Sequence, residues 1–397
     1  MKKFYFTLTS ILLISINGFA IQLSDNAEVS LLTVSPGTEL YSAFGHTAIR
    51  INDSQIDFDW TFNYGLFNFN QPNFYLNFTK GDLFYKLGAQ QYEYFIEDYQ
   101  YENRSVFEQV LNLNAEQKQE IFDFLLWNAK PENATYLYDY FFDNCSTRPR
   151  DVIMTGVGAI FWDSSYIEKP KSIRQLTDEY LVNQQPWGDF GIDLAMASKI
   201  NRPATFMEYM FLPEYLQMAL EKAKIMQNGQ MVNLVQKANT PYIALPEKPI
   251  THMGTPAQIF GGLLIIGLLI SFVDYKRKTI SLWFDGFILA TIGLTGLLLL
   301  LLWLFTTHHP AEWNLNIAWA FPVHLLVAFL LFNKSIRPKL AYYFLANTFV
   351  LMLLLIGWIW FPQEIHYSLL PLMVLLMLRS AYYYRFFKTM KAEKQHT

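Results

Sequence analysis

The sequence is poor in cysteine and in charge, and both shortages restrict what the chain can be. One of its 397 residues is a cysteine, Cys145, so the chain forms no internal disulfide. Charged residues make up 16% of the chain and the net charge is -4. A chain without a basic surplus is not a nucleic-acid binder by bulk electrostatics. Its 52% hydrophobic content excludes a disordered protein.

The first twenty residues have the pattern of a secretory signal peptide. Lys2 and Lys3 precede an apolar stretch, and small residues stand at the two positions that signal peptidase reads. We therefore predict a signal peptide over residues 1–20 and a mature chain that begins near Ile21. An uncleaved anchor helix is the alternative, although the apolar stretch is short for a bilayer span.

The rest of the chain divides into a soluble half and a membrane half. Residues 21 to about 250 mix polar, aromatic and charged side chains, whereas the sequence from Ile259 onward is strongly apolar. Several apolar segments approach the ~20 residues that cross a bilayer. About five membrane helices are predicted, at residues 259–273, 282–305, 317–332, 341–361 and 367–378.

Lys and Arg are missing from two loops between these segments, and this predicts the topology. Residues 306–316 and 362–367 contain neither, whereas basic clusters follow the first, third and fifth segments. Cytoplasmic loops of membrane proteins carry the excess of Lys and Arg. We therefore expect the soluble half outside the cytoplasm, in agreement with the signal peptide, and the carboxyl terminus inside.

Local patterns in the soluble half predict an α+β domain with a helical extension. Alternating and aromatic-rich runs, such as residues 46–51 and 56–62, favour strands joined by a short turn. Residues 115–130 have helical spacing, with Asn114 as a plausible N-cap. The predicted boundaries are a thiol domain at 21–171, a helical extension at 172–240, a proline-rich linker at 241–256, an all-α transmembrane domain at 257–380 and a basic tail at 381–397.

Cys145 lies where a helix is predicted to begin. Asp143 and Asn144 are good N-cap residues, and Pro149 suits a first turn. At a helix amino terminus the backbone dipole and Arg148 favour a thiolate, and nearby N–H groups stabilise an oxyanion. We predict that Cys145 is a nucleophile supported by Asn144 and Arg148. The alternative is a small buried hydrophobe, which the polar neighbours disfavour.

A thiol nucleophile needs a base, and His46 is the candidate. The other histidine of the soluble half, His252, lies in the proline-rich linker. If the turn after His46 makes a simple four-residue hairpin, His46 shares a sheet face with Asp57, Asp59 and Asn63. Each of these three side chains can orient the imidazole as the third residue of a catalytic triad. We predict Asp59 for this role.

The order of these residues and the motifs around them resemble known proteins. A histidine on an early strand, followed by Asn-Cys at a helix start, reverses the order of ordinary papain-like enzymes and resembles the circularly permuted papain-like superfamily. The surrounding motifs are residues 44–50, 63–69, 78–85, 143–148, 186–194 and 206–213, with His309-Pro310 and Asn314-Leu315-Asn316 in the second half. Together they resemble Lnb, the lipoprotein N-acyltransferase family of Bacteroidota.

The resemblance implies a fold, a location and a reaction. The fold is a circularly permuted papain-like domain in the periplasm, anchored in the bacterial inner membrane. The reaction is transfer of an acyl chain from a phospholipid to the amino group of diacylglyceryl-cysteine on a lipoprotein. A thiolate suits this reaction because a thioester intermediate divides one slow transfer into two steps. Neither a cofactor nor a metal ion is predicted.

A second candidate site lies in the loop before the third membrane segment. His309, Asn314 and Asn316 are on the same side of the membrane as Cys145 in the predicted topology. They either bind lipid headgroups near the active site or belong to an ordinary solvated loop. The sequence favours neither interpretation.

Two other functions stay open at this point. A membrane-tethered cysteine peptidase or amidase would use the same thiol and base with water as the acceptor. A non-enzymatic envelope assembly factor would make Cys145 dispensable. The sequence does not separate acyl transfer from hydrolysis, because both share the first half-reaction.

Overall fold

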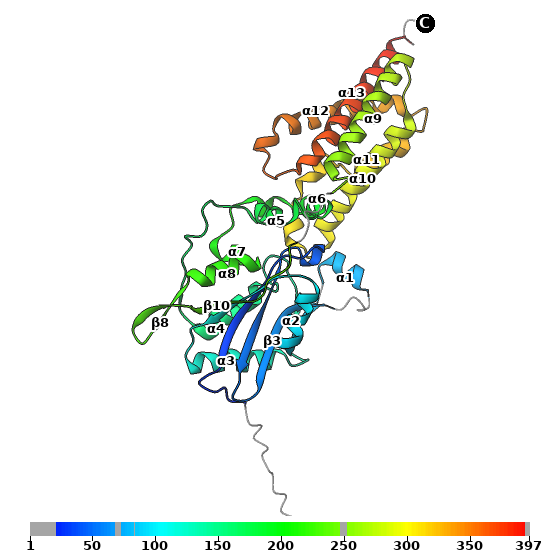
Figure 1. Ribbon diagram of the computed structural model, residues 1–397. Helices are drawn as coiled ribbons and strands as arrows, with labels where there is room; N and C mark the ends of the chain where they lie inside the picture. The colour runs from blue at the N-terminus through cyan, green and yellow to red at the C-terminus, as the bar shows by residue number, and fades with distance from the viewer. Residues whose placement is uncertain (1–20, 68–72, 83, 247–251, 394–397) are drawn as a thin grey trace, which may run out of the picture.

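The computed structural model describes residues 21–67, 73–82, 84–246 and 252–393, so the predicted signal peptide lies outside the described residues. The chain forms an α/β domain, from one end of which a domain of long helices extends (Figure 1).

An antiparallel sheet of seven strands is the centre of the α/β domain. The strands lie in the order β10-β5-β1-β2-β3-β4-β6. They are β1 (Glu28–Val34), β2 (His46–Asp53), β3 (Phe58–Leu66), β4 (Phe84–Gln91), β5 (Val106–Leu111), β6 (Thr135–Leu137) and β10 (Val235–Tyr242). The hairpin of β2 and β3 places Ala48 opposite Asn63. This register gives the parity predicted from the sequence, with His46 on the same sheet face as Asn63.

Helices cover both faces of this sheet. They are α2 (Tyr92–Tyr101) on one face and α3 (Ala115–Asn128) and α4 (Thr147–Val157) on the other, whereas α1 (Phe74–Lys80) contacts the helical domain. Apolar residues of α3 and α4, such as Phe122 and Ile153, share one buried cluster with Ile49 of β2. Phe95 of α2 packs with Ala48 in another cluster. The predicted helix at 115–130 is present, and Asn114 caps it as expected by accepting the backbone N–H of residue 117.

The predicted helical extension, residues 172–240, is helical only as far as Lys222. Its helices are α5 (Ile173–Leu181), α6 (Pro186–Ala195), α7 (Phe206–Tyr209) and α8 (Pro213–Lys222). Strand β10 then completes the large sheet beside β5. A small second sheet contains β7 (Ile160–Phe161), β8 (Lys224–Gln227) and β9 (Gln230–Asn233). Asn228 and Gly229, both at positive φ, form the turn between β8 and β9, a short hairpin signal that the helical interpretation overlooked.

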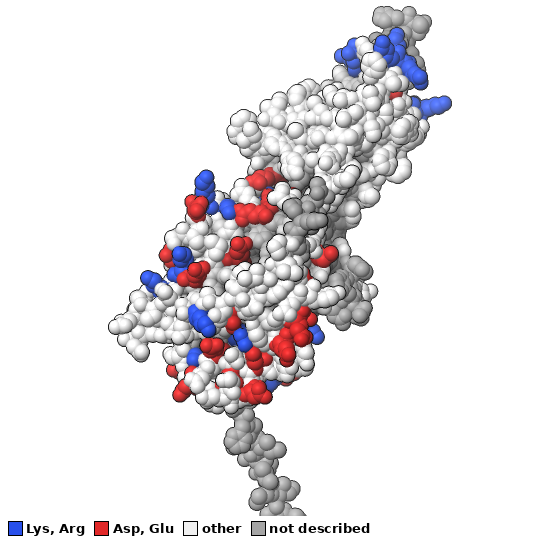
Figure 2. Space-filling view, viewed as in Figure 1, with Lys and Arg blue, Asp and Glu red and all other residues white. Residues whose placement is uncertain are grey.

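The second domain contains α9 (Pro256–Arg277), α10 (Leu282–Phe305), α11 (Val323–Leu330), α12 (Ala341–Ile356) and α13 (Leu370–Glu393). Among the described residues, four helical segments are long and apolar enough to cross a membrane, and they end with Arg337–Ile356. The predicted fifth span, residues 367–378, lies in the first part of α13 and stays a prediction. Figure 2 shows an uncharged band over these helices, between a basic end near the carboxyl terminus and the charged α/β domain.

Three buried charges hold the basic end of the helical domain together. Arg379 of α13 donates to Asp285 of α10 at 2.6 Å and to Asp274 of α9 at 2.8 Å. All three side chains are almost fully buried. Buried charges are tolerated when they are paired, so this cluster fixes the three helices to one another.

Helix α6 joins the two domains through hydrogen bonds to the helical domain. The Leu194 carbonyl of α6 accepts N–H groups from Asn314 at 2.8 Å and from Asn316 at 3.1 Å. Asp189 of α6 pairs with the buried His366 at 3.0 Å. We call these five residues the α6 junction. Polar groups buried in this way depend on their partners, so the junction sets how the α/β domain sits on the helices.

We expect Asn314→Ala to destabilise the protein by about 1–3 kcal/mol, because it removes the side-chain donor to the Ala195 carbonyl and one of the two donors to the Leu194 carbonyl of α6. The free energy of unfolding of the purified full-length protein in detergent measures this effect. His309→Ala is the matched control, because His309 lies in the same loop with an exposed side chain. Equal stability of the two variants would contradict the role of the junction.

Candidate active site

Asn144 builds the loop that carries Cys145. Its side-chain oxygen accepts the backbone N–H groups of Ser146 at 2.7 Å and of Thr147 at 2.9 Å. Its amide nitrogen donates to the carbonyls of Tyr140 and Phe211. The predicted capping role of Asn144 at the start of α4 is therefore present. Because both amide N–H groups are already used, Asn144 positions the thiol loop and has no donor left for an oxyanion.

The thiol loop is attached to the end of the sheet where β2 begins and β3 ends. The hydroxyl of Thr47 donates to the carbonyl of Cys145. Gly65, at a φ of +91°, passes so close that a Cβ on it would lie 3.3 Å from the Cβ of Cys145. A glycine is required there, because a side chain would be strained and would crowd the thiol. The backbone N–H of Thr47, the residue after His46, also favours a negative charge on the sulfur, so the thiol lies near the start of β2, where His46 stands.

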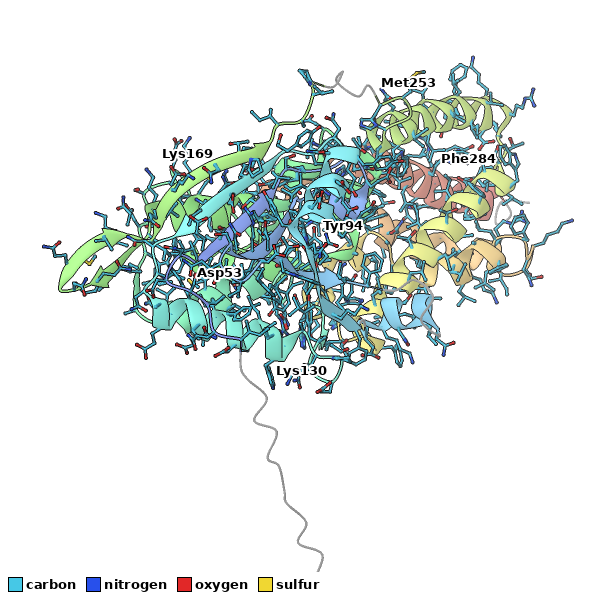
Figure 3. All side chains as sticks on the ribbon, turned by 60° about the horizontal axis from the view of Figure 1, so that its bottom comes forward. Asp53, Tyr94, Lys130, Lys169, Met253 and Phe284 are labelled. Atoms are coloured by element: carbon cyan, nitrogen blue, oxygen red, sulfur yellow. The ribbon has the colours of Figure 1, made fainter. Side chains whose placement is uncertain are left out.

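This end of the sheet is the one nearer to the helical domain. The opposite end, at Asp53, points away from the helix that carries Phe284 (Figure 3). Helix α1, inserted between β3 and β4, reaches the helical domain, where the N–H of Thr307 donates to the carbonyl of Lys80 at 2.8 Å. The candidate site therefore lies at the end of the α/β domain that is nearer to the membrane helices.

Asn63 orients His46, and Asp59 does not. The Nε2 atom of His46 lies 3.2 Å from the Oδ1 atom of the buried Asn63. An amide oxygen is an acceptor, so this contact selects the tautomer with hydrogen on Nε2 and leaves Nδ1 free to take a proton. Asp59 instead accepts two hydrogen bonds from Arg50, both at 2.7 Å. The structure therefore replaces the predicted Asp59 with Asn63, one of the alternatives weighed for the same face.

The thiol and the imidazole are both neutral at rest. Burial raises the pKa of Cys145 to about 11, although hydrogen bonds from the backbone of Thr47 and of Cys145 itself act in the opposite direction. Burial lowers the pKa of His46 to about 4, against the hydrogen bond of Asn63. The prediction that the helix start favours a thiolate is therefore wrong for the resting site, because desolvation outweighs the local donors.

Arg148 does not act on the thiol as predicted. Its guanidinium pairs with Asp143, with one contact at 2.6 Å, and lies 4.0 Å above the ring of Tyr136. The cation that lowers the pKa of both Cys145 and His46 is Arg104, which no sequence motif indicated. Arg104 reaches the site from the turn after α2, a placement that depends on the tertiary fold.

Tyrosines surround the thiol. Burial raises the pKa values of Tyr85, Tyr99, Tyr138 and Tyr140, and a negative charge on Cys145 acts in the same direction. The rings of Tyr85 and Tyr138 stack with centroids 4.1 Å apart. These phenols therefore stay protonated, and they form an amphipathic wall around the sulfur.

Cys145 and His46 both remain partly exposed, so a substrate can reach them. Among the described residues no hydrogen bond joins the two side chains. Catalytic hydrogen bonds are often long in ligand-free sites and shorten when substrate binds. The arrangement is a thiol, a base whose tautomer is set by Asn63 and backbone N–H groups that favour a negative charge on the sulfur, which together suit nucleophilic attack on a carbonyl.

The second predicted site, His309, Asn314 and Asn316, lies at the domain boundary. The two asparagines belong to the α6 junction, where their amide groups bind the Leu194 carbonyl. His309 pairs with Glu312 at 2.9 Å. The asparagines therefore join the domains, and their buried amide groups face protein rather than solvent.

Comparison with known protein families gave two matches. Residues 21–179 match the Lnb N-terminal periplasmic domain, and residues 248–391 match the Lnb transmembrane domain. Together the matches cover about three quarters of the chain. Comparison with curated proteins and with solved structures gave no significant match.

We expect the rate at which iodoacetamide alkylates Cys145 to rise about tenfold per pH unit from neutral pH toward pH 10, because the thiolate is the reactive form. The high pKa of Cys145 keeps that form scarce at neutral pH. Mass spectrometry of the intact protein measures the adduct, and Cys145→Ser is the blank, because the chain has one cysteine. A rate that is constant between about pH 5 and pH 8 would instead indicate a resting thiolate–imidazolium pair.

Proposed function

The chain belongs to the Lnb family, and on that premise we propose that it is a lipoprotein N-acyltransferase of the bacterial inner membrane. It takes an acyl chain from a phospholipid onto Cys145 and passes it to the free amino group of diacylglyceryl-cysteine on a lipoprotein. The observation that carries this proposal is the contact of Thr47 with the Cys145 carbonyl at the start of β2, next to His46 in sequence and at the sheet end nearer to the helical domain (Figure 3).

We infer that the α/β domain is a circularly permuted papain-like fold. The base and its orienting amide, His46 and Asn63, come early on adjacent strands, and the thiol follows at the start of α4. Ordinary papain-like enzymes have the cysteine first. A thiol, an imidazole and an amide oxygen in these roles form the Cys-His-Asn variant of the catalytic triad.

The first half-reaction forms a thioester. The Cys145 proton moves to Nδ1 of His46 as the sulfur attacks the ester carbonyl of the phospholipid. The backbone N–H groups of Thr47 and Cys145, which favour a negative charge on the sulfur, are the candidates to stabilise the oxyanion. The ester C–O bond then breaks, and the leaving oxygen takes the proton back from His46, which releases a lysophospholipid.

The second half-reaction forms the amide. The neutral amino group of the lipoprotein attacks the thioester carbonyl, a C–N bond forms and the C–S bond breaks. The proton lost by the nitrogen passes through His46 to the departing sulfur, so the thiol and the neutral imidazole are restored. Because His46 has a low pKa, it returns this proton readily and ends each cycle as a free base.

The helical domain supplies the location for this chemistry. Both substrates are held in the membrane, so a site fixed to membrane helices meets them at a high local concentration. The basic end of the helices lies far from the α/β domain, which supports a cytoplasmic carboxyl terminus and a periplasmic thiol (Figure 2).

We expect phospholipid alone to load Cys145 with an acyl chain as a hydroxylamine-sensitive thioester, and a diacylated lipopeptide with a free amino terminus to discharge it as an amide. Intact-protein mass spectrometry follows both steps. Cys145→Ala should carry no adduct, and His46→Ala should load at least about a hundredfold more slowly. If the thioester decays at the same rate with and without lipopeptide and releases free fatty acid, the protein is a hydrolase instead.

Asn63→Ala and Asp59→Ala separate the two candidates for the orienting residue. We expect Asn63→Ala to slow loading of Cys145 by about 10–100-fold, because the imidazole loses the hydrogen bond that fixes its tautomer. This is a part of the rate enhancement that general acid–base catalysis contributes. Asp59→Ala should load within about threefold of the wild type, since Asp59 binds Arg50 and not the imidazole. Rates are normalised to folded protein by circular dichroism. The reverse order of the two rates would restore Asp59 as the third member.

A further inference from the structure

Arg104 is a buried cation beside the candidate site. Its backbone N–H donates to the carbonyl of Tyr99, and its Nε donates to the carbonyl of Ser35 at 2.9 Å. The residue is 6% exposed. Gly37 makes room for the side chain, because a Cβ on Gly37 would lie 3.1 Å from the Cδ of Arg104. The guanidinium is therefore fixed in place by the backbone on two sides.

One nitrogen of this guanidinium is unused. Nη1 of Arg104 donates to Glu102 at 2.8 Å, whereas Nη2 is buried and has no hydrogen-bond partner among the described residues. Three other buried arginines, Arg50, Arg174 and Arg379, each use all three nitrogens. A buried donor that lacks a partner costs free energy, which is recovered when a ligand supplies the acceptor.

The guanidinium of Arg104, which carries the unused Nη2, lies near Cys145 and His46. Ser35 follows Val34, which pairs with His46 across the sheet. The ring of Tyr99 lies 5.0 Å from the Arg104 guanidinium and 6.3 Å from the ring of His46. The positive charge of Arg104 also lowers the pKa of both His46 and Cys145. An anion bound at Nη2 would therefore lie close to the base and the thiol.

We infer that Nη2 of Arg104 binds a phosphate oxygen of the phospholipid acyl donor, an inference that rests on the proposed function. Arginine is well suited to phosphate because its planar donors match the phosphate oxygens. In a glycerophospholipid the phosphate is several bonds from the ester carbonyl, so one molecule can reach Arg104 and Cys145 together. Glu102 binds Nη1 and is much more exposed than Arg104, so Nη2 stays available to a second anion.

The test compares two acyl donors that differ in the phosphate. Full-length protein in detergent is loaded either from phosphatidylglycerol or from p-nitrophenyl palmitate, which has no phosphate. We expect Arg104→Gln to slow loading from phosphatidylglycerol about 10–100-fold more than loading from the p-nitrophenyl ester, mainly through KM, because the charge at Cys145 and His46 is lost for both donors and the phosphate contact only for the first. Arg104→Lys should recover part of the loss, because it keeps the charge without the planar fork. Arg202→Gln is the matched control, because Arg202 forms an exposed pair with Glu208.

A second measurement detects phosphate binding without acyl transfer. We expect glycerol 3-phosphate to slow the alkylation of Cys145 by iodoacetamide in the wild type and in Arg202→Gln, and to have no effect in Arg104→Gln. Equal loss with both acyl donors, or protection that survives in Arg104→Gln, would overturn the inference. If p-nitrophenyl palmitate loads the wild type and phosphatidylglycerol does not, the proposed function fails, and protection by glycerol 3-phosphate then decides the inference about Arg104 by itself.

Discussion

The attachment of α6 to the helical domain is the constraint on which the rest of the molecule depends. Asn314 and Asn316 bind a carbonyl of α6, and Asp189 pairs with His366, so several buried polar groups are satisfied only when the two domains are docked. A buried polar group without its partner costs free energy, which makes docking cooperative. The position of the thiol relative to the membrane helices is therefore fixed by this junction.

The resting state of the site follows from desolvation. A partly exposed but strongly desolvated thiol and imidazole stay neutral, because moving a proton between them would create two charges in a poorly solvated place. The same desolvation protects the enzyme. The only cysteine of an exported chain is exposed to oxidants, and a protonated thiol reacts with them far more slowly than a thiolate does. The proton therefore moves from Cys145 to His46 only after a substrate has bound.

Local patterns in the sequence predicted much of the architecture. The family assigned from the motifs is confirmed, and hairpin parity correctly placed His46 and Asn63 on one face. Asp59 does not contact His46, because it lies opposite Asn52, further along the hairpin, where it accepts hydrogen bonds from Arg50 on the same sheet face. Strand β10 was missed because its partner, β5, is distant in the sequence, whereas the turn between β8 and β9 had a local signal that was overlooked. The placement of β10 depends on contacts between segments far apart in the chain.

The buried cluster of Arg379 with Asp274 and Asp285 imposes an order on biogenesis. The two carboxylates lie on α9 and α10, which leave the ribosome first, and their cation lies on α13, close to the end of the chain. Until α13 is made, both acidic groups must remain near the water interface, because an unpaired charge is costly inside a bilayer. The helical domain therefore reaches its final packing only after α13 has been inserted. In a chain truncated before Arg379, the two carboxylates have lost their common ion-pair partner.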